Sequence, residues 1–259
     1  MRALTSLALL FALCASAGAA ESAARLQRAR SRPGAWVGPA VVTGHLGFAA
    51  RSARVETALT ALPALAFGLD LWPTEALGLY AGGAIGLGAR ISVPGTDSTI
   101  AYNLHQFEGG VRGRWFLGPR ANAPAALVGV GLRGLYQTTQ VQRPALLVDR
   151  IIAGPELAAG VTWPVLVDRL VLRLWARGQL PFFVRETPTD SGDPRSFSGY
   201  GARAEASLRL DGAWGILAQI DWWAIGVDFA GEGTRAAGVD DASTDDSLIM
   251  LALSARYAF

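Results

Sequence analysis

Hydrophobic and polar residues alternate over long stretches of this chain, most clearly at its end. Within residues 246–259, every second residue from the last one back to Ile249 is apolar: Phe259, Tyr257, Ala255, Leu253, Leu251 and Ile249. The opposite phase is mixed and contains Arg256 and Ser254. Successive side chains of a β-strand point to opposite faces, so this pattern predicts a strand with one apolar and one mixed face.

The same period of two recurs from residue 36 onward and predicts ten strands. They cover residues 36–50, 55–72, 76–92, 103–117, 124–140, 150–164, 170–184, 198–210, 214–229 and 246–259. The connections after the second, fourth, sixth and eighth strands are short, whereas those after the third, fifth, seventh and ninth are long. An even number of strands with short turns at one end and long loops at the other is typical of a transmembrane β-barrel.

A final strand that ends on an aromatic residue resembles the closing strand of bacterial outer-membrane β-barrels. In that family the terminal aromatic residue and its alternating partners, here Phe259 and Tyr257, are the recognition signal for the barrel-insertion machinery. The resemblance implies an all-β, ten-stranded antiparallel up-and-down barrel over residues 36–259. It also implies a monomer in the bacterial outer membrane whose partners are membrane lipid, lipopolysaccharide and the insertion machinery.

The first twenty residues have the three parts of a secretory signal peptide. Arg2 precedes an apolar core, Leu4–Leu13, which is followed by the small residues Ala17–Ala19. Cys14, the only cysteine of the chain, lies within this segment. Residues 21–35 are rich in arginine and lack strand periodicity, which predicts a flexible basic arm in the periplasm.

The composition agrees with a barrel and speaks against some other classes of protein. Hydrophobic residues make up 51% of the chain, yet no stretch after the signal approaches the length of apolar sequence that a membrane-spanning helix needs. A barrel conceals such hydrophobicity by alternation. Without Arg2, 22 arginines face 21 acidic residues, and this near-neutral balance speaks against nucleic-acid binding.

Charged residues fall on one face of the predicted strands. When the more apolar phase of each strand is placed outward, the outward phase has no charge away from the strand ends, as contact with lipid requires. The residues collected on the inward phase are predicted to line the lumen. They are Glu56, Asp70, Arg90, Glu108, Arg112, Arg114, Arg133, Glu156, Arg173, Arg177, Arg203, Glu205, Arg209, Asp221 and Arg256.

Aromatic residues on the outward phase are predicted to form two girdles at the membrane interfaces. The periplasmic girdle contains Trp36, Trp115, Trp163, Trp214, Tyr257 and Phe259, and the outer girdle contains Phe48, Tyr136, Phe182 and Tyr200.

The predicted interior allows two interpretations. A ten-stranded barrel is narrow, so arginines and carboxylates pointing inward are expected to pair across the lumen. They form either a salt-bridge plug or a narrow solute path, and the excess of arginine over acid on this face would then favour anions.

The two histidines of the chain do not match the motifs of known enzymatic barrels. Omptin proteases have an Asp-x-His element and lipid A deacylases a His-x-Ser element, whereas here the sequences are TGHLGF around His45 and NLHQFE around His105. We therefore expect no catalytic residues, cofactor or metal ion. Barrel closure would bring His45 close to Ser254 or Arg256.

Three functional hypotheses remain from the sequence. The first is a structural or narrow, anion-favouring barrel, the second a barrel whose long outer loops bind a surface partner, and the third, disfavoured, a lipid-modifying or proteolytic enzyme. A soluble β-protein is the alternative fold. The last long loop, residues 230–246, is acidic and is predicted to be solvated.

Overall fold

A computed structural model describes residues 33–51, 53–92, 99–118, 123–139, 147–166, 169–180, 183–210, 212–235 and 241–259. The predicted signal peptide and nearly all of the predicted basic arm lie outside these residues. No helix among them is long and apolar enough to span a membrane.

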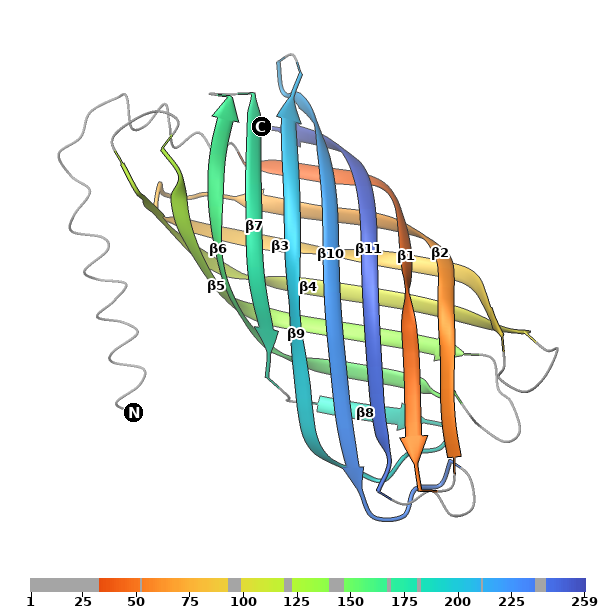
Figure 1. The fold of residues 1–259 in the computed structure, drawn as a ribbon. Coiled ribbons are helices and arrows are strands. Elements are labelled where there is room, and N and C mark those ends of the chain that lie inside the picture. Colours follow the sequence, from red (N-terminus) through yellow and green to blue (C-terminus); the bar gives the residue numbers. More distant parts are fainter. Residues whose placement is uncertain are drawn as a thin grey trace, which may run out of the picture.

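The described residues form one antiparallel sheet that closes on itself (Figure 1). Its strands are β1 (Gly34–Ala50), β2 (Ala53–Leu71), β3 (Leu77–Ser92), β4 (Thr99–Phe116), β5 (Ala125–Thr139), β6 (Asp149–Leu166), β7 (Leu170–Gln179), β8 (Phe183–Thr187), β9 (Asp193–Arg209), β10 (Trp214–Ala230) and β11 (Ser243–Ala258). Pairing of β1 with β11 and of β5 with β6 closes the ring, which confirms the all-β barrel.

The eleven described strands occupy ten positions around the barrel, because β7 and β8 are two segments of one interrupted strand. β7 pairs with β6 and β9, whereas β8 pairs only with the start of β6. The predicted strand over residues 170–184 is therefore interrupted after Gln179, and the predicted ten-stranded antiparallel barrel is confirmed.

The wall divides into two sheets toward the end of the barrel that carries the longer loops. Pairing between β2 and β3 stops at Ala64 and Gly86, and pairing between β7 and β9 stops at Gln179 and Gly199. Beyond these points β9, β10, β11, β1 and β2 continue as one sheet, which runs in a different direction from β3 to β6 (Figure 1). The inner faces of the two sheets enclose an apolar cluster that includes Phe48, Leu59, Tyr102 and Phe229.

Two β-bulges lie close to the point where the sheets separate. Opposite Thr43 of β1, β2 has two residues, Thr60 and Ala61. Opposite Asn103 of β4, β3 also has two residues, one of which is Gly88 with a φ of 79°. A bulge adds one residue to one strand, and in β3 the extra turn needs a backbone angle that glycine adopts readily.

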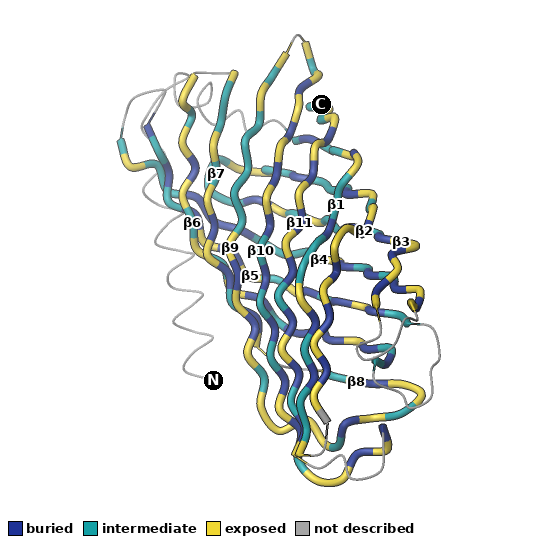
Figure 2. Tube along the Cα trace, turned by 45° about the vertical axis from the view of Figure 1, so that its right-hand side comes forward, coloured by how far each residue is buried: buried dark blue, intermediate teal, exposed yellow. Residues whose placement is uncertain are grey.

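The polarity of the wall inverts along the strands. On the periplasmic half of β11, outward residues such as Leu251 and Leu253 are apolar and exposed, whereas Asp245 occupies the same face farther along. Exposed and buried residues alternate along the strands on both sides of this change (Figure 2). Inward residues change in the opposite sense, from charged groups to the apolar cluster. We call the part beyond the inversion the outer lobe: residues 43–50 of β1, 53–61 of β2, 193–199 of β9, 223–230 of β10 and 243–248 of β11, with the facing ends of β3 to β6 and β8.

Strand length explains why such a lobe exists. Crossing the hydrocarbon core takes about 9–11 residues of a tilted strand, whereas β2 has 19 and β1, β9 and β10 have 17 each. The remaining residues must lie in water, where the soluble pattern of polar outside and apolar inside is stable. We therefore expect the inversion to mark the outer surface of the membrane.

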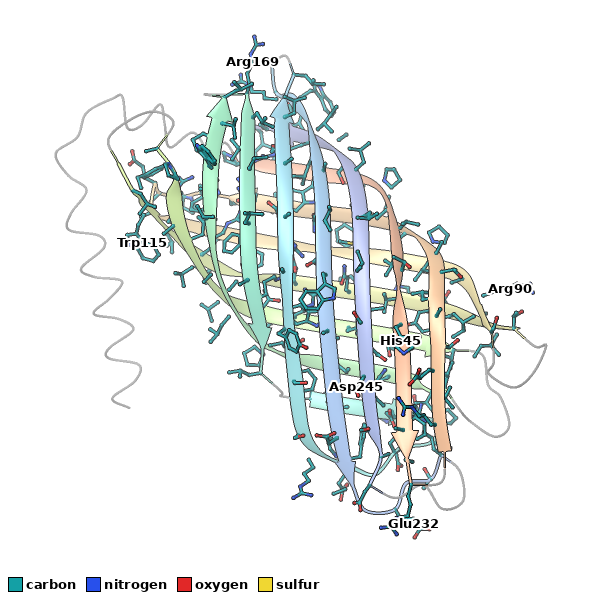
Figure 3. The ribbon with its side chains drawn as sticks, viewed as in Figure 1. His45, Arg90, Trp115, Arg169, Glu232 and Asp245 are labelled. Carbon is teal, nitrogen blue, oxygen red and sulfur yellow. The ribbon has the colours of Figure 1, made fainter. Side chains whose placement is uncertain are left out.

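Because of the bulges, two residues predicted to line the lumen lie on the outer face instead. Since one extra residue moves all following side chains to the opposite face, the outer parts of β2 and β3 are out of phase with their inner parts. The Glu56 side chain is 50% exposed and forms an ion pair with Arg54 on the outer surface. Arg90 is likewise exposed and projects from the end of β3 (Figure 3). The prediction that both line the lumen is wrong.

The strand β1 also faces the other way from the prediction. It has no Asp, Glu or Arg whose position could indicate which face points inward. In the outer lobe, apolar residues are stable on the inner face and not on the outer face, which is the reverse of the rule used for the prediction. Phe48 is buried and Trp36 lines the interior, so neither belongs to a girdle. His45 is exposed and pairs across the strands with Ser247, and not with either residue predicted for it.

Most of the other predicted girdle residues do face outward. Trp163, Trp214, Tyr257 and Phe259 are exposed near the periplasmic end, and Tyr136 and Tyr200 are exposed farther out. The ring centroids of Trp214 and Tyr257 are 5.0 Å apart. Trp115 is partly exposed, and Phe182 lies outside the described residues.

Candidate functional site

The interior of the membrane-spanning half holds a layer of charged side chains. It contains twelve of the predicted lumen residues, with buried or mostly buried side chains: Asp70, Glu108, Arg112, Arg114, Arg133, Glu156, Arg173, Arg177, Arg203, Glu205, Asp221 and Arg256. Arg209 lies at the periplasmic rim, where its Nε donates to the carbonyl of Gly212 at 3.1 Å. The layer is thus built from widely separated strands that only barrel closure brings together.

The central part of this layer is a charge-balanced cluster around Arg177. Its Nη2 is 2.7 Å from Glu156 Oε2, its Nη1 is 3.2 Å from Asp221 Oδ2, and it also donates to Glu108. Arg203 bonds to Glu108 at 2.5 Å and to Asp221 at 2.6 Å. With Arg133 beside the same carboxylates, three arginines face three acids.

The periplasmic part of the layer is richer in arginine. Asp70 is paired with Arg112 and lies 3.3 Å from Arg173, which also contacts Glu205 at 3.3 Å. Two more arginines of this part bind neutral groups. Arg114 donates to the carbonyl of Glu75 at 2.7 Å, and Arg256 donates to Ser207 Oγ at 2.8 Å.

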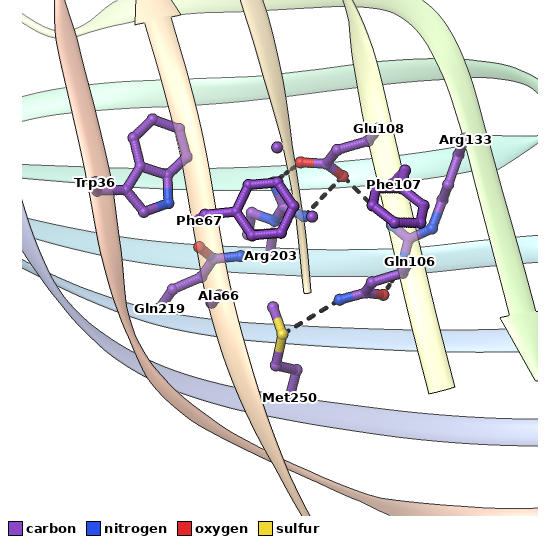
Figure 4. Close-up of a pocket in the computed structure, with 12 residues that line it drawn as sticks. Trp36, Ala66, Phe67, Gln106, Phe107, Glu108, Arg133, Arg203, Gln219 and Met250 are labelled. Atoms are coloured by element: carbon purple, nitrogen blue, oxygen red, sulfur yellow. Dashed lines mark hydrogen bonds and ion pairs between the residues drawn. The ribbon is translucent and has the colours of Figure 1, made fainter. Parts of the chain in front are cut away.

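The border between the charged layer and the apolar cluster includes Gln106 and Met250, which the sequence did not predict as lumen residues (Figure 4). Gln106 accepts a hydrogen bond from Arg133 at 2.9 Å and donates one to the sulfur of Met250 at 3.2 Å. The Arg133 guanidinium also lies 4.2 Å from the centre of the Trp223 ring. Each of these side chains has both polar and apolar or polarisable atoms, so it can contact the charged layer on one side and the apolar cluster on the other.

A second missed group is a polar cluster enclosed in the outer lobe. Arg150 is paired with Asp246 and bonds to Thr244 Oγ1 at 2.6 Å and Gln137 Oε1 at 3.0 Å. Gln137 in turn donates to Asp246 at 2.9 Å. Arg150 and Asp246 are the first residues of their predicted strands, where phase carries little information, so the sequence did not place them inside.

At the outer end of the interior, Arg235 joins two loops to the barrel wall. We call this group of contacts, made by Thr234 and Arg235 with Phe48, Glu186, Asp190 and Ser191, the latch. The Arg235 guanidinium lies 4.0 Å from the centre of the Phe48 ring, and its Nη1 is 3.0 Å from Ser191 Oγ, which donates to Glu186 at 2.6 Å. Thr234 and Arg235 donate their backbone N–H groups to the carbonyl of Asp190. Burial lowers the pKa of the Arg235 guanidinium to about 10, so the group remains charged at pH 7.

The space left between these groups is small. Three cavities in the charged layer have volumes of about 10, 20 and 30 Å³. A cavity needs roughly 10–15 Å³ to hold one water. Each of these three cavities therefore has room for single waters or a small ion and not for a hydrated solute.

The outward face of the membrane-spanning half is a continuous belt of exposed apolar side chains, and this belt shows where the barrel contacts lipid. All described Asp, Glu and Arg residues on the outward face lie outside the apolar belt, toward the outer lobe or in turns. A closed barrel satisfies its backbone hydrogen bonds internally and is one of the two structures that can span a membrane. This chain is a transmembrane β-barrel.

No protein-family model matches the chain, and no curated protein matches it in sequence. It is similar in structure to the transport unit of the autotransporter AIDA-I from Escherichia coli, at 14% identity, with a TM-score of 0.46 over 98% of each chain. It is also similar to the outer membrane protein OprG from Pseudomonas aeruginosa, at 10% identity and a TM-score of 0.38, over 88% of this chain and 97% of that one. With TM-scores below 0.5, these likenesses add nothing to what the strand pairing establishes.

Removing the latch is expected to loosen the outer end without unfolding the barrel. In Arg235→Ala, Glu186 loses its neighbouring cation and the loops lose a bond and a stacking contact, so local opening should become at least about tenfold more frequent. Limited proteolysis of the outer loops in the refolded barrel would measure this. Arg195→Ala, which removes an exposed arginine nearby, should leave the cleavage rate unchanged. Equal rates for the two variants would show that the latch holds nothing.

Proposed function

We propose that this protein is a sealed outer-membrane barrel that anchors a folded lobe on the cell surface. The observation that carries the proposal is the inversion of polarity along the strands. An open pore needs a continuous polar path, whereas here the charged layer gives way to an apolar cluster that includes Leu59, Leu62 and Val227. The outer parts of the strands thus enclose a packed apolar core, where a pore would need a water-filled mouth.

Three features in series support the sealed state. The three described cavities of the charged layer have volumes of about 10, 20 and 30 Å³, the apolar cluster would have to admit desolvated ions, and the Arg235 latch lies at the outer end. In this proposal the outer lobe is the working part. Its surface, with the described loop residues 188–192, 231–235 and 241–242, would bind a surface partner.

Conductance of the refolded barrel in a planar bilayer tests the sealed state. The expected result is a folded barrel, verified by its heat-dependent gel mobility, that shows no steady openings. Steady openings would overturn the proposal in favour of the second candidate, a narrow anion-favouring pore. That candidate is supported by the surplus of arginine in the charged layer, and its current should be anion-selective and weaken in Arg173→Ala.

We also propose that the last strand is the signal for insertion into the membrane. Tyr257 and Phe259 are both exposed on the lipid-facing side, with ring centroids 6.4 Å apart, so the partner machinery can reach them before closure. Phe259→Ala should then reduce the amount of barrel assembled in cells several-fold. Refolding of the same variant in detergent should be unaffected, since one exposed ring contributes little to the folded state. Equal losses in both settings would contradict a signalling role.

We further propose that the barrel is not an enzyme. His45 and His105 lie on different strands of the outer wall, and within the described residues neither imidazole bonds to a carboxylate. His105 instead packs against Tyr136, with ring centroids 5.9 Å apart. Lipid hydrolysis by the wild type that is lost in His45→Ala would contradict this proposal.

A further inference from the structure

The surplus of positive charge in the charged layer is confined to its periplasmic part. The central cluster is neutral, with Arg133, Arg177 and Arg203 facing three carboxylates. The periplasmic part has four arginines, which are Arg112, Arg114, Arg173 and Arg256, against the carboxylates of Asp70 and Glu205, with Glu75 near Arg114 at the rim. Buried charge without a counter-charge is strongly unfavourable, so this region attracts anions.

A cavity of about 20 Å³ lies at the junction of the two parts. Four arginines line it, namely Arg112, Arg173, Arg203 and Arg256, together with the carboxylates of Asp70, Glu108 and Glu205. The lining therefore carries one more positive than negative charge. A volume of this size holds about one water or one ion of a single atom.

Three Nε donors of this lining have no hydrogen-bond acceptor, whereas Nη2 of Arg112 is in the ion pair with Asp70. The Nε atoms of Arg112, Arg203 and Arg256 are all buried, and none has a hydrogen-bond partner. A buried donor without an acceptor is rare in a native protein and usually marks an unseen water or ion. These donors belong to arginines of three strands, β4, β9 and β11, that line the same small cavity. A spherical anion can accept hydrogen bonds from several directions at once, which a planar carboxylate does less well.

The cavity is also within reach of solvent. Arg256 lies close to the end of β11 and is only partly buried, so the periplasm is the near side. We propose that this cavity binds one chloride ion, which neutralises the surplus charge and accepts hydrogen bonds from the three arginines. The ion is a structural counter-ion of the closed barrel, and its presence does not depend on conduction.

Unfolding of the refolded mature barrel in urea tests the site. Titration with sodium chloride, with sodium gluconate holding the ionic strength constant, should raise the unfolding midpoint saturably, because chloride binds the folded state alone and gluconate is too large to enter. In parallel, crystals grown in bromide should show an anomalous peak between Arg112, Arg203 and Arg256.

Matched variants separate the site from general salt effects. Arg256→Met removes one donor and the surplus charge, and it should weaken chloride binding about tenfold or more, the effect of one charge-assisted hydrogen bond. Arg209→Met removes a rim arginine that does not line the cavity and should leave the titration unchanged. If Arg256→Met does not fold, the bromide peak in the wild type decides. Equal midpoints in chloride and gluconate, without a bromide peak, would mean that the cavity holds only water.

Discussion

Replacing Arg177 with methionine is expected to lower the free energy of unfolding by about 3–5 kcal/mol, the usual cost of removing one partner from a buried ion pair. Arg177 contacts Glu108, Glu156 and Asp221, and its loss leaves two arginines for three buried carboxylates. Urea unfolding of the refolded barrel, followed by tryptophan fluorescence, would measure the change.

Two further variants give this experiment its controls. Arg54→Met breaks an ion pair of similar length, but the Arg54 side chain is 77% exposed, so the loss should stay below about 1 kcal/mol. Combining Arg177→Met with Glu156→Gln should recover part of the loss, because one unpaired carboxylate is then removed. Equal effects of the Arg177 and Arg54 variants would contradict a tightly paired layer.

Placing an arginine on the lipid-facing side of β11 should cost an amount that depends on its height. Leu253→Arg lies in the apolar belt, where an arginine near the membrane centre destabilises a barrel by about 2–4 kcal/mol. Asp245→Arg lies on the same face of the same strand, beyond the polarity inversion, and should cost no more than about 1 kcal/mol. Unfolding in lipid vesicles, and not in detergent, is the appropriate measurement.

The two positions form a matched pair, since the strand, the face and the introduced residue are the same. If Asp245→Arg were as costly as Leu253→Arg, the membrane would extend over the outer lobe and the inverted polarity would need another explanation.

The sequence predicted the strands and the charged layer because both follow from local alternation. Asp70, Arg112 and Arg177 were placed correctly since lipid tolerates no charge on the opposite face. The same rule failed for Glu56 and Arg90, because a bulge changes the phase within a strand and leaves no clear mark in composition. It also failed for β1, whose apolar residues could face either lipid or the core of the outer lobe.

The contacts within the site could not be derived from the sequence. Pairing of Arg177 with Glu108, or of Arg150 with Asp246, depends on the stagger of strands across the barrel, which alternation does not specify. The outer lobe itself was missed, although strands longer than the membrane is thick were a signal for it. The latch of Arg235 lies in a loop, where no periodicity exists.

The most direct test is a cysteine scan along the outward face of β11 in intact cells, with a maleimide that cannot cross membranes. The mature chain predicted from the sequence has no cysteine of its own, so each substitution reports one position. Ser243→Cys and Ser247→Cys should be labelled, while Ile249→Cys and Leu253→Cys should not, which places the membrane surface between Ser247 and Ile249. Labelling at Leu253, or protection at Ser243, would contradict a lobe that stands outside the membrane.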